Sequence, residues 1–305
     1  MASTTRSLIR PRVHHRDLRE RIVEAILFTC AASAVAITTA IVVVLLVESA
    51  GFFERVSIVD FLTDTMWTPL FAEARYGILP LLCGTVLAAG VALIVAVPLG
   101  LMVALYLSEF APVKVRETIK PFLELLEGVP TVVYGYFALL FVTPLLRNFI
   151  PDLPGFNVLS PGIVIGIMIV PYVASVSEDA MRAVPNSLRE ASYACGATRL
   201  QTTLRVVVPA ATSGIVAAFM LGIARATGET MVVAIAAGQQ PNLTLDPREP
   251  AATITAYIVQ VALGDLPHGS IGYQSIFAAG LVLLVITLLF NVLAHLLRMR
   301  FREAY

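Results

Sequence analysis

The sequence predicts an all-α, polytopic membrane protein with six transmembrane helices. Hydrophobic residues make up 58% of the 305 residues and charged residues 14%, whereas about a quarter of the residues in a soluble domain are charged. The mean hydropathy is +0.84. Six segments are apolar over a length that can span a bilayer as a helix: residues 25–47, 81–107, 129–146, 162–176, 211–236 and 276–297. We therefore expect a basic N-terminal arm over residues 1–24 and a transmembrane domain over residues 25–305.

The first and third segments need separate arguments. The first is longer than the apolar core of a signal peptide, which is about 7–15 residues, and residues 48–52 form a poor cleavage site, so we interpret it as a retained helix. The third starts beside Pro130, and proline is common in the first turn of a helix. The second and sixth are long apolar runs, and basic residues follow the sixth.

The fourth segment is the shortest and contains Pro171. The Ser-Pro pair at residues 160–161 is typical of a helix start. Gly162 and Gly166 have the small-xxx-small spacing that allows two helices to pack closely, so we assign them to packing alone.

Basic residues are distributed unevenly between the predicted spans. Sixteen lie in four segments that should share one side of the membrane: Arg6, Arg10, Arg12, Arg16, Arg19, Arg21, Lys114, Arg116, Lys120, Arg182, Arg189, Arg199, Arg205, Arg298, Arg300 and Arg302. The other loops hold four: Arg55, Arg75, Arg147 and Arg248. The positive-inside rule therefore predicts that both termini are cytoplasmic and that the protein is a multi-pass component of the cell inner membrane.

The fifth segment contains an arginine and a glutamate within an otherwise apolar run. A charge near the bilayer centre costs about 2.5–3.5 kcal/mol on insertion scales and is kept where a partner, a cavity or a substrate compensates for it. Arg225 and Glu229 are four residues apart and are expected to share one helix face, yet this order is the poorer one for an intrahelical pair. Two interpretations remain: the residues line a ligand path, or they form a buried ion pair with a neighbouring helix.

Motifs of enzymes and cofactor sites are missing from the sequence. It has no HExxH, no GxSxG and no GxxxxGK[ST] phosphate loop, and neither lysine follows a glycine. Cys30, Cys83 and Cys195 are isolated, which argues against a disulfide framework or a thiolate metal site. We expect no catalytic residue, no metal and no cofactor in this chain, and any ATP that is used must bind to another chain. We expect contact with membrane lipid and no nucleic-acid partner.

The loop before the fifth span, residues 177–209, contains two short helix signals. Residues 187–190 and 198–201 each fit the capping box S/T-x-x-E/Q, and Gly196 lies between them where a helix C-cap is needed. Leu188, Ala191 and Cys195 would form an apolar stripe, with Arg189 on a more polar face. The pattern predicts two helices joined at a glycine, either packed under the bundle or exposed for a partner.

Part of this loop resembles the EAA loop of ABC-importer permeases. Glu190, Ala191 and Ser192 are followed by three residues, Gly196, nine residues and the Val-Val-Val-Pro run at residues 206–209. The family pattern is EAA, three residues, G, nine residues and IxLP, so the spacing agrees and Ser192 replaces the third alanine. The resemblance implies a type I ABC-importer permease fold, with Glu190, Ala191, Ser192 and Gly196 docking on an ATPase subunit.

Three further segments resemble the permeases of the phosphate-specific transport system: residues 128–135, 170–180 and 225–231. The Gly-Glu-Thr followed by Met231 is closer to the PstC subunit than to PstA. Thr131 stands where this family often has serine. The resemblance implies a permease subunit that forms a phosphate pathway and couples to ATPase subunits that bind ATP and Mg. The implied partners are a PstA-like permease, PstB-like ATPases, a PstS-like phosphate-binding protein and inorganic phosphate.

The chemistry of the fifth segment suits an oxyanion. An arginine fork can bind two phosphate oxygens through charge-assisted hydrogen bonds. We expect Arg225 to contact the anion and Glu229 to limit how tightly it is held, with Thr230 and Thr131 also on the pathway. Alternatives are a PstA-type subunit, a permease for phosphonate, sulfate or molybdate, and, from another class, a passive anion channel or a membrane scaffold.

Overall fold

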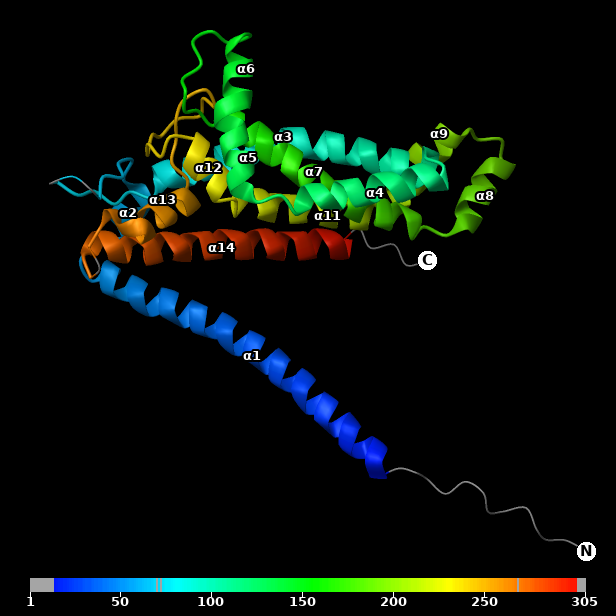
Figure 1. Ribbon diagram of the computed structural model, residues 1–305, viewed down its shortest axis with the longest axis horizontal. Coiled ribbons are helices and arrows are strands. Elements are labelled where there is room, and N and C mark those ends of the chain that lie inside the picture. Colours follow the sequence, from blue (N-terminus) through cyan, green and yellow to red (C-terminus); the bar gives the residue numbers. More distant parts are fainter. Residues whose placement is uncertain (1–13, 70, 72, 268, 301–305) are drawn as a thin grey trace, which may run out of the picture. The chain divides into compact units, whose positions relative to one another are not determined.

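The protein is mostly helical in the part that a computed structural model describes, residues 14–69, 71, 73–267 and 269–300 (Figure 1). Two isolated β-bridges are the only extended pairings among these residues. The predicted all-α class is confirmed. Most of the basic arm, with Arg6, Arg10 and Arg12, lies outside the described residues, as does Arg302.

The chain divides into two compact units, residues 1–48 and residues 49–305. Helix α1 (His14–Phe53) supplies the described part of the first unit. Residues 19–53 of this helix are apolar and long enough to cross a membrane, and large apolar side chains such as Phe28 are exposed along it. The first predicted span is confirmed as one uninterrupted helix.

The second unit contains the remaining helices. They are α2 (Ile58–Thr63), α3 (Leu79–Leu105), η1 (Tyr106–Phe110), α4 (Val113–Glu127), α5 (Thr131–Phe137), η2 (Ala138–Val142), α6 (Thr143–Arg147), α7 (Leu159–Arg182), α8 (Asn186–Ala194), α9 (Arg199–Thr202), η3 (Thr203–Val207), α10 (Val208–Ala210), α11 (Thr212–Thr227), α12 (Met231–Ala236), α13 (Ile254–Gln260), η4 (Val261–Asp265) and α14 (Ile271–Arg300). The η elements are π-helical turns, and η1 continues α3.

Among the described residues, four helices can cross a membrane as continuous spans: α1, α3 with η1, α7 and α14. Two helix pairs qualify only as bent spans. The segments 113–127 and 131–147 meet at 87°, and the segments 199–210 and 212–227 meet at 72°. The count reaches six when each bent pair is taken as one span, which agrees with the prediction.

Helix α7 is the centre of the second unit and packs along both α3 and α11. Its glycines make the approach of α3 possible, because a Cβ added at Gly162 would lie 2.6 Å from Val91 Cγ1, and one added at Gly166 would lie 2.7 Å from the carbonyl oxygen of Ala92. The packing role predicted for Gly162 and Gly166 is confirmed. Pro171 lies inside α7, which runs from residue 159 to residue 182 and is longer than the predicted span.

Two predicted boundaries are wrong. Residues 113–127 were expected in a loop but form the amphipathic helix α4, which turns sharply at residues 128–130. The fifth span, predicted over residues 211–236, is interrupted at residues 228–230 between α11 and α12. Hydropathy averaged over a window does not detect a three-residue break.

Candidate functional site

The break between α11 and α12 is formed by residues 228–230, Gly-Glu-Thr. Gly228 is the C-cap of α11. The Thr230 hydroxyl donates to the Gly228 carbonyl at 3.1 Å, and the Thr227 hydroxyl donates to the Ile223 carbonyl at 2.8 Å. Threonine hydroxyls compete with the helix for its own carbonyls, so the local sequence explains why the helix ends here.

Arg225 lies in the last turn of α11, and its side chain is exposed on this chain. Its guanidinium carbon lies 5.1 Å from the centre of the Tyr172 ring of α7, a cation–π contact. Within the part of the chain that the structure describes, the guanidinium has no hydrogen bond or ion pair. The stacked face is therefore covered, while the N–H donors along its edge are uncommitted.

Glu229 is buried, and it does not pair with Arg225. Its carboxylate accepts a hydrogen bond from the Val232 N–H at 3.3 Å, and its carbonyl accepts one from the Thr255 hydroxyl of α13 at 2.8 Å. The prediction that Arg225 and Glu229 share a helix face is wrong. Helix α11 ends at Thr227, so residues 225 and 229 do not belong to one helix and their spacing of four residues does not place them on the same face. Neither Arg225 nor Glu229 forms an ion pair with a neighbouring helix among the described residues, so the alternative of a buried ion pair to a neighbour is not observed.

The second motif segment lies beside this break. Thr131 is the first residue of α5, directly after Pro130, and is half-buried. Helix α5 packs on α12 (Figure 1), since a Cβ added at Gly135 would lie 2.8 Å from the Ile235 side chain and 3.2 Å from the Met231 carbonyl. Two segments that are about a hundred residues apart in the sequence, the one after the α4–α5 bend and the one around the α11–α12 break, therefore meet in the fold.

The segment between α12 and α13 is held by its own polar contacts. The Arg248 guanidinium lies 2.6 Å from an Asp246 carboxylate oxygen, and its hydrogen bonds lower the pKa of Asp246 to about 2. The Ala251 N–H donates to the Ala237 carbonyl at 3.1 Å. These contacts fix the path by which the chain returns from the end of α12 to Thr255.

The predicted elbow of two short helices is present in the loop before α11. Helices α8 and α9 are joined at Gly196, whose φ of +81° is the left-handed conformation that favours glycine. The Thr198–Gln201 capping box is formed. The predicted Ser187–Glu190 box is wrong, because α8 already begins at Asn186 after Pro185 and neither residue occupies the cap.

Three of the four residues predicted to dock on an ATPase are exposed on this elbow. Glu190, Ala191 and Gly196 are exposed, and the Glu190 carboxylate makes no hydrogen bond or ion pair with the described residues. Ser192 is half-buried, and its hydroxyl lies 2.9 Å from the Thr202 hydroxyl, which connects α8 to α9. The elbow thus presents a free carboxylate and small residues, and their docking role stays a prediction.

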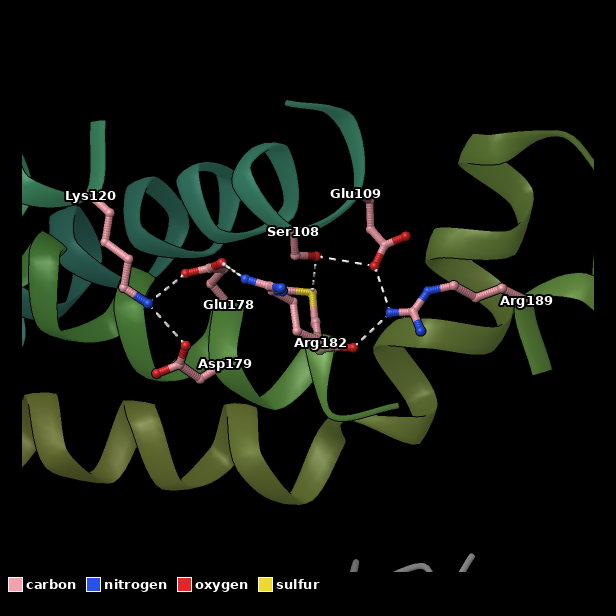
Figure 2. A network of polar contacts seen from close by, with 8 residues as sticks. Ser108, Glu109, Lys120, Glu178, Asp179, Arg182 and Arg189 are labelled. Atoms are coloured by element: carbon pink, nitrogen blue, oxygen red, sulfur yellow. Dashed lines mark hydrogen bonds and ion pairs between the residues drawn. The ribbon is translucent and has the colours of Figure 1, made fainter. Parts of the chain in front are cut away.

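Arg189 departs from its predicted position on a polar face. Figure 2 shows its guanidinium directed at Glu109 of η1, with Nη2 2.9 Å from the carboxylate. Only 14% of the Arg189 side chain and 5% of the Glu109 side chain are exposed. A second cluster in the same view joins α4 to α7, because Lys120 Nζ lies 3.0 Å from both Glu178 and Asp179.

Sequence reasoning missed both clusters. Glu109 and Glu178 each follow a predicted span, the second and the fourth, by two residues. Acidic residues that adjoin membrane spans are a signal of a polar partner, but the partners are 80 and 58 residues away in the chain.

A helical bundle with an uncommitted arginine at a helix break and an exposed elbow of two short helices defines a multi-pass membrane transport component. Residues 96–303 match the model of the family described as binding-protein-dependent transport system inner membrane component. The chain belongs to this family, whose members are the membrane-spanning subunits of such systems.

Curated relatives agree with this membership over most of their length. The chain is 37% identical to the probable ABC transporter permease protein YqgH of Bacillus subtilis, covering 94% of this chain and 93% of the relative. It is 34% identical to the phosphate transport system permease protein PstC of Mesorhizobium japonicum, over 79% of this chain and 78% of the relative. It is also 34% identical to PstC 1 of Mycobacterium tuberculosis, over 82% and 84%.

Solved structures support the fold. A bacterial ABC transporter involved in the import of the acidic polysaccharide alginate matches with a TM-score of 0.66 at 18% identity, over 96% of this chain and 100% of that chain. The MetNI methionine ABC transporter, in an inward-facing conformation, matches with a TM-score of 0.54 at 17% identity, over 74% and 95%. At these identities the likeness concerns architecture alone.

Proposed function

We propose that this chain is the PstC-type permease subunit of an ATP-driven phosphate import complex. The observation that carries the proposal is the Arg225 guanidinium, which stacks on Tyr172 and leaves its edge donors free at a break in a helix. The relatives named as phosphate permeases support the choice of substrate. A passive channel or a scaffold has no need of the exposed elbow of α8 and α9, and the family membership favours transport.

Phosphate near neutral pH carries between one and two negative charges, and a planar guanidinium can donate to two of its oxygens at once. Non-helical backbone at membrane depth is tolerated where it is buried or lines a cavity. We place the anion pathway along the break, with Arg225 as its contact. The Thr131 hydroxyl can donate to a further oxygen, and the Thr230 hydroxyl can do so when it exchanges its hydrogen bond to the Gly228 carbonyl for one to the anion.

Glu229 has a different role in this proposal. Its carboxylate is buried and accepts only the Val232 N–H among the described groups, so it adds negative potential beside the pathway without neutralising Arg225 directly. Such a charge weakens anion binding and favours release, and conduction requires binding that is not too tight.

The proposed complex has a PstA-like permease beside this chain, PstB-like ATPases that bind ATP and Mg, and a PstS-like phosphate-binding protein outside. Glu190, Ala191, Ser192 and Gly196 form the ATPase dock, and both termini are cytoplasmic. A PstA-type role, or another oxyanion as substrate, is the competing assignment within the same class.

The experiment is uptake of labelled phosphate by the assembled complex in proteoliposomes, with sulfate and molybdate as competitors. Arg225→Leu should assemble, because an uncharged helix inserts more favourably by about 2.5–3.5 kcal/mol, and its uptake should fall to background. Arg225→Lys keeps the charge without the planar fork and should be partly active. Leu221→Ala, one turn earlier on the same exposed face, is the matched control and should transport like the parent. Normal uptake by assembled Arg225→Leu would make the arginine structural and contradict the proposed pathway.

A further inference from the structure

Among the described residues, the polar contacts of helix α8 with the membrane spans are made by Arg189. Nη2 of Arg189 donates to a Glu109 carboxylate oxygen at 2.9 Å and to the Met181 carbonyl at 2.8 Å, and Nη1 donates to the Val184 carbonyl at 2.5 Å. Glu109 belongs to η1, which continues α3, and Met181 belongs to α7. One guanidinium therefore joins three elements (Figure 2).

The rest of α8 is weakly attached in the described structure. No residue of α8 is buried. Leu188 packs against a small apolar cluster that includes Met181 and Val184, and Ser192 bonds to Thr202. The outer residues, such as Glu190 and Tyr193, are exposed.

We propose that Glu109 is a positioning residue for energy coupling: through Arg189 it holds α8 on the ends of α3 and α7, so that movement of the ATPase dock moves these two spans. This inference rests on the proposed function. In this arrangement the exposed residues of α8 bind the ATPase subunit, and the buried Glu109–Arg189 ion pair connects α8 to the spans. A displacement of α8 is transmitted to the spans only while that ion pair is intact. The carbonyl oxygens of Met181 and Val184, at the end of α7, also accept hydrogen bonds from the guanidinium. Carbonyl oxygens at a helix C-terminus favour a cation at position 189 and would repel a carboxylate there.

Burial makes the loss of either partner of the Glu109–Arg189 ion pair costly. The Glu109 side chain is 5% exposed and the Arg189 side chain 14%, so removing the charge of one partner leaves the other in a poorly hydrated place. Ser108 also donates to the Glu109 carboxylate, at 3.2 Å, and keeps its orientation. Loss of this buried ion pair should therefore weaken the attachment of α8, whereas loss of a solvent-exposed ion pair changes stability little.

The same region contains a matched control. Glu178 is also buried; it lies 3.0 Å from Lys120 of α4 and 3.5 Å from Arg182 of its own helix, and the Lys120 pair joins α4 to α7 without involving α8. Loss of either pair should loosen the bundle, whereas only loss of the Glu109–Arg189 pair should release the docking helix.

The test uses the whole complex, reconstituted with its ATPase and binding subunits, and measures phosphate transported per ATP hydrolysed. Glu109→Gln keeps an acceptor oxygen and removes the charge, and it should lower this ratio at least about threefold while the ATPase subunits stay bound. Arg189→Lys should lower it less, since a cation remains, and Lys120→Gln should leave it at the parent value. A parent ratio in Glu109→Gln, or an equal fall in Lys120→Gln, would overturn the proposal.

A second measurement separates this proposal from the proposed function. Amide hydrogen exchange over residues 186–194 should be at least about tenfold faster in Glu109→Gln than in Lys120→Gln, whatever the substrate. A parent complex that hydrolyses ATP without transporting phosphate would contradict the proposed function. The hydrogen-exchange rates of residues 186–194 would still show whether Glu109 holds α8 in place. Unchanged exchange in Glu109→Gln would refute the attachment of α8 through this pair.

Discussion

The contact between α3 and α7 predicts a sharp difference between two glycine-to-alanine substitutions. At Gly166 the added methyl group would lie 2.7 Å from the Ala92 carbonyl oxygen and 2.7 Å from Val95 Cβ. Neither atom is the flexible end of a side chain, so the two helices would have to separate by a few tenths of an ångström. At Gly90, on the same pair of helices, nothing lies within 4 Å of the added group.

The magnitude follows from two opposing effects. Overpacking of a tight interface costs about 1–3 kcal/mol, and the upper part of this range applies because backbone and Cβ atoms are involved. Alanine is favoured over glycine inside a helix by about 0.5–1 kcal/mol. Gly166→Ala should therefore destabilise the protein by about 1–2 kcal/mol, and Gly90→Ala should be neutral or stabilising by up to about 1 kcal/mol.

The assay is reversible denaturant unfolding of the purified protein in one detergent, with both variants and the parent measured side by side. Only the difference between the two alanine variants is interpreted, since detergent and unfolded-state effects are shared. If Gly166→Ala were as stable as Gly90→Ala, α3 and α7 would not approach each other as described, and the packing role of Gly166 would be refuted.

Three other changes test the site, the elbow and the topology. Tyr172→Leu should reduce transport several-fold and Tyr172→Phe should not, because the cation–π interaction between the ring and the Arg225 guanidinium contributes about 0.5–2 kcal/mol. Equal uptake by both variants, normalised to assembled complex, would contradict the stacking role of Tyr172. Gly196→Ala should weaken ATPase-subunit association, since a left-handed residue with a Cβ costs about 1–2 kcal/mol, while Gly196→Asn should do so less; equal association of both with the parent would show that the elbow does not matter for docking. Cysteines introduced at positions 190 and 242, in a background without the native cysteines, should differ in labelling by an impermeant thiol reagent on intact cells, and labelling at 190 alone would reverse the proposed orientation.

The sequence was sufficient for features that depend on local composition. Apolar length located the spans, and the glycine at position 196 located the elbow, because a left-handed C-cap is a property of one residue and its neighbours. The close packing at Gly162 and Gly166 followed from residue size at helical spacing.

The features that the sequence did not reveal depend on contacts between distant segments or on short breaks. The partner of Arg189 is 80 residues away, and no spacing rule connects them. Averaging of hydropathy over a window concealed the interruption at residues 228–230, so the shared helix face of Arg225 and Glu229 was inferred for a helix that ends at Thr227. Tyr172 was part of a recognised segment, but its place over Arg225 needed the fold.

The exposure of Arg225 also affects the steady-state amount of this protein in the cell. Arg225 is exposed within an apolar segment, and a charge at such a position costs about 2.5–3.5 kcal/mol on insertion scales when lipid surrounds it. Any companion chain that covers this surface or encloses it in a hydrated path removes that penalty, and so stabilises the subunit by mass action. The abundance of this chain should therefore follow the supply of the proposed PstA-like permease, with surplus copies degraded by membrane proteases.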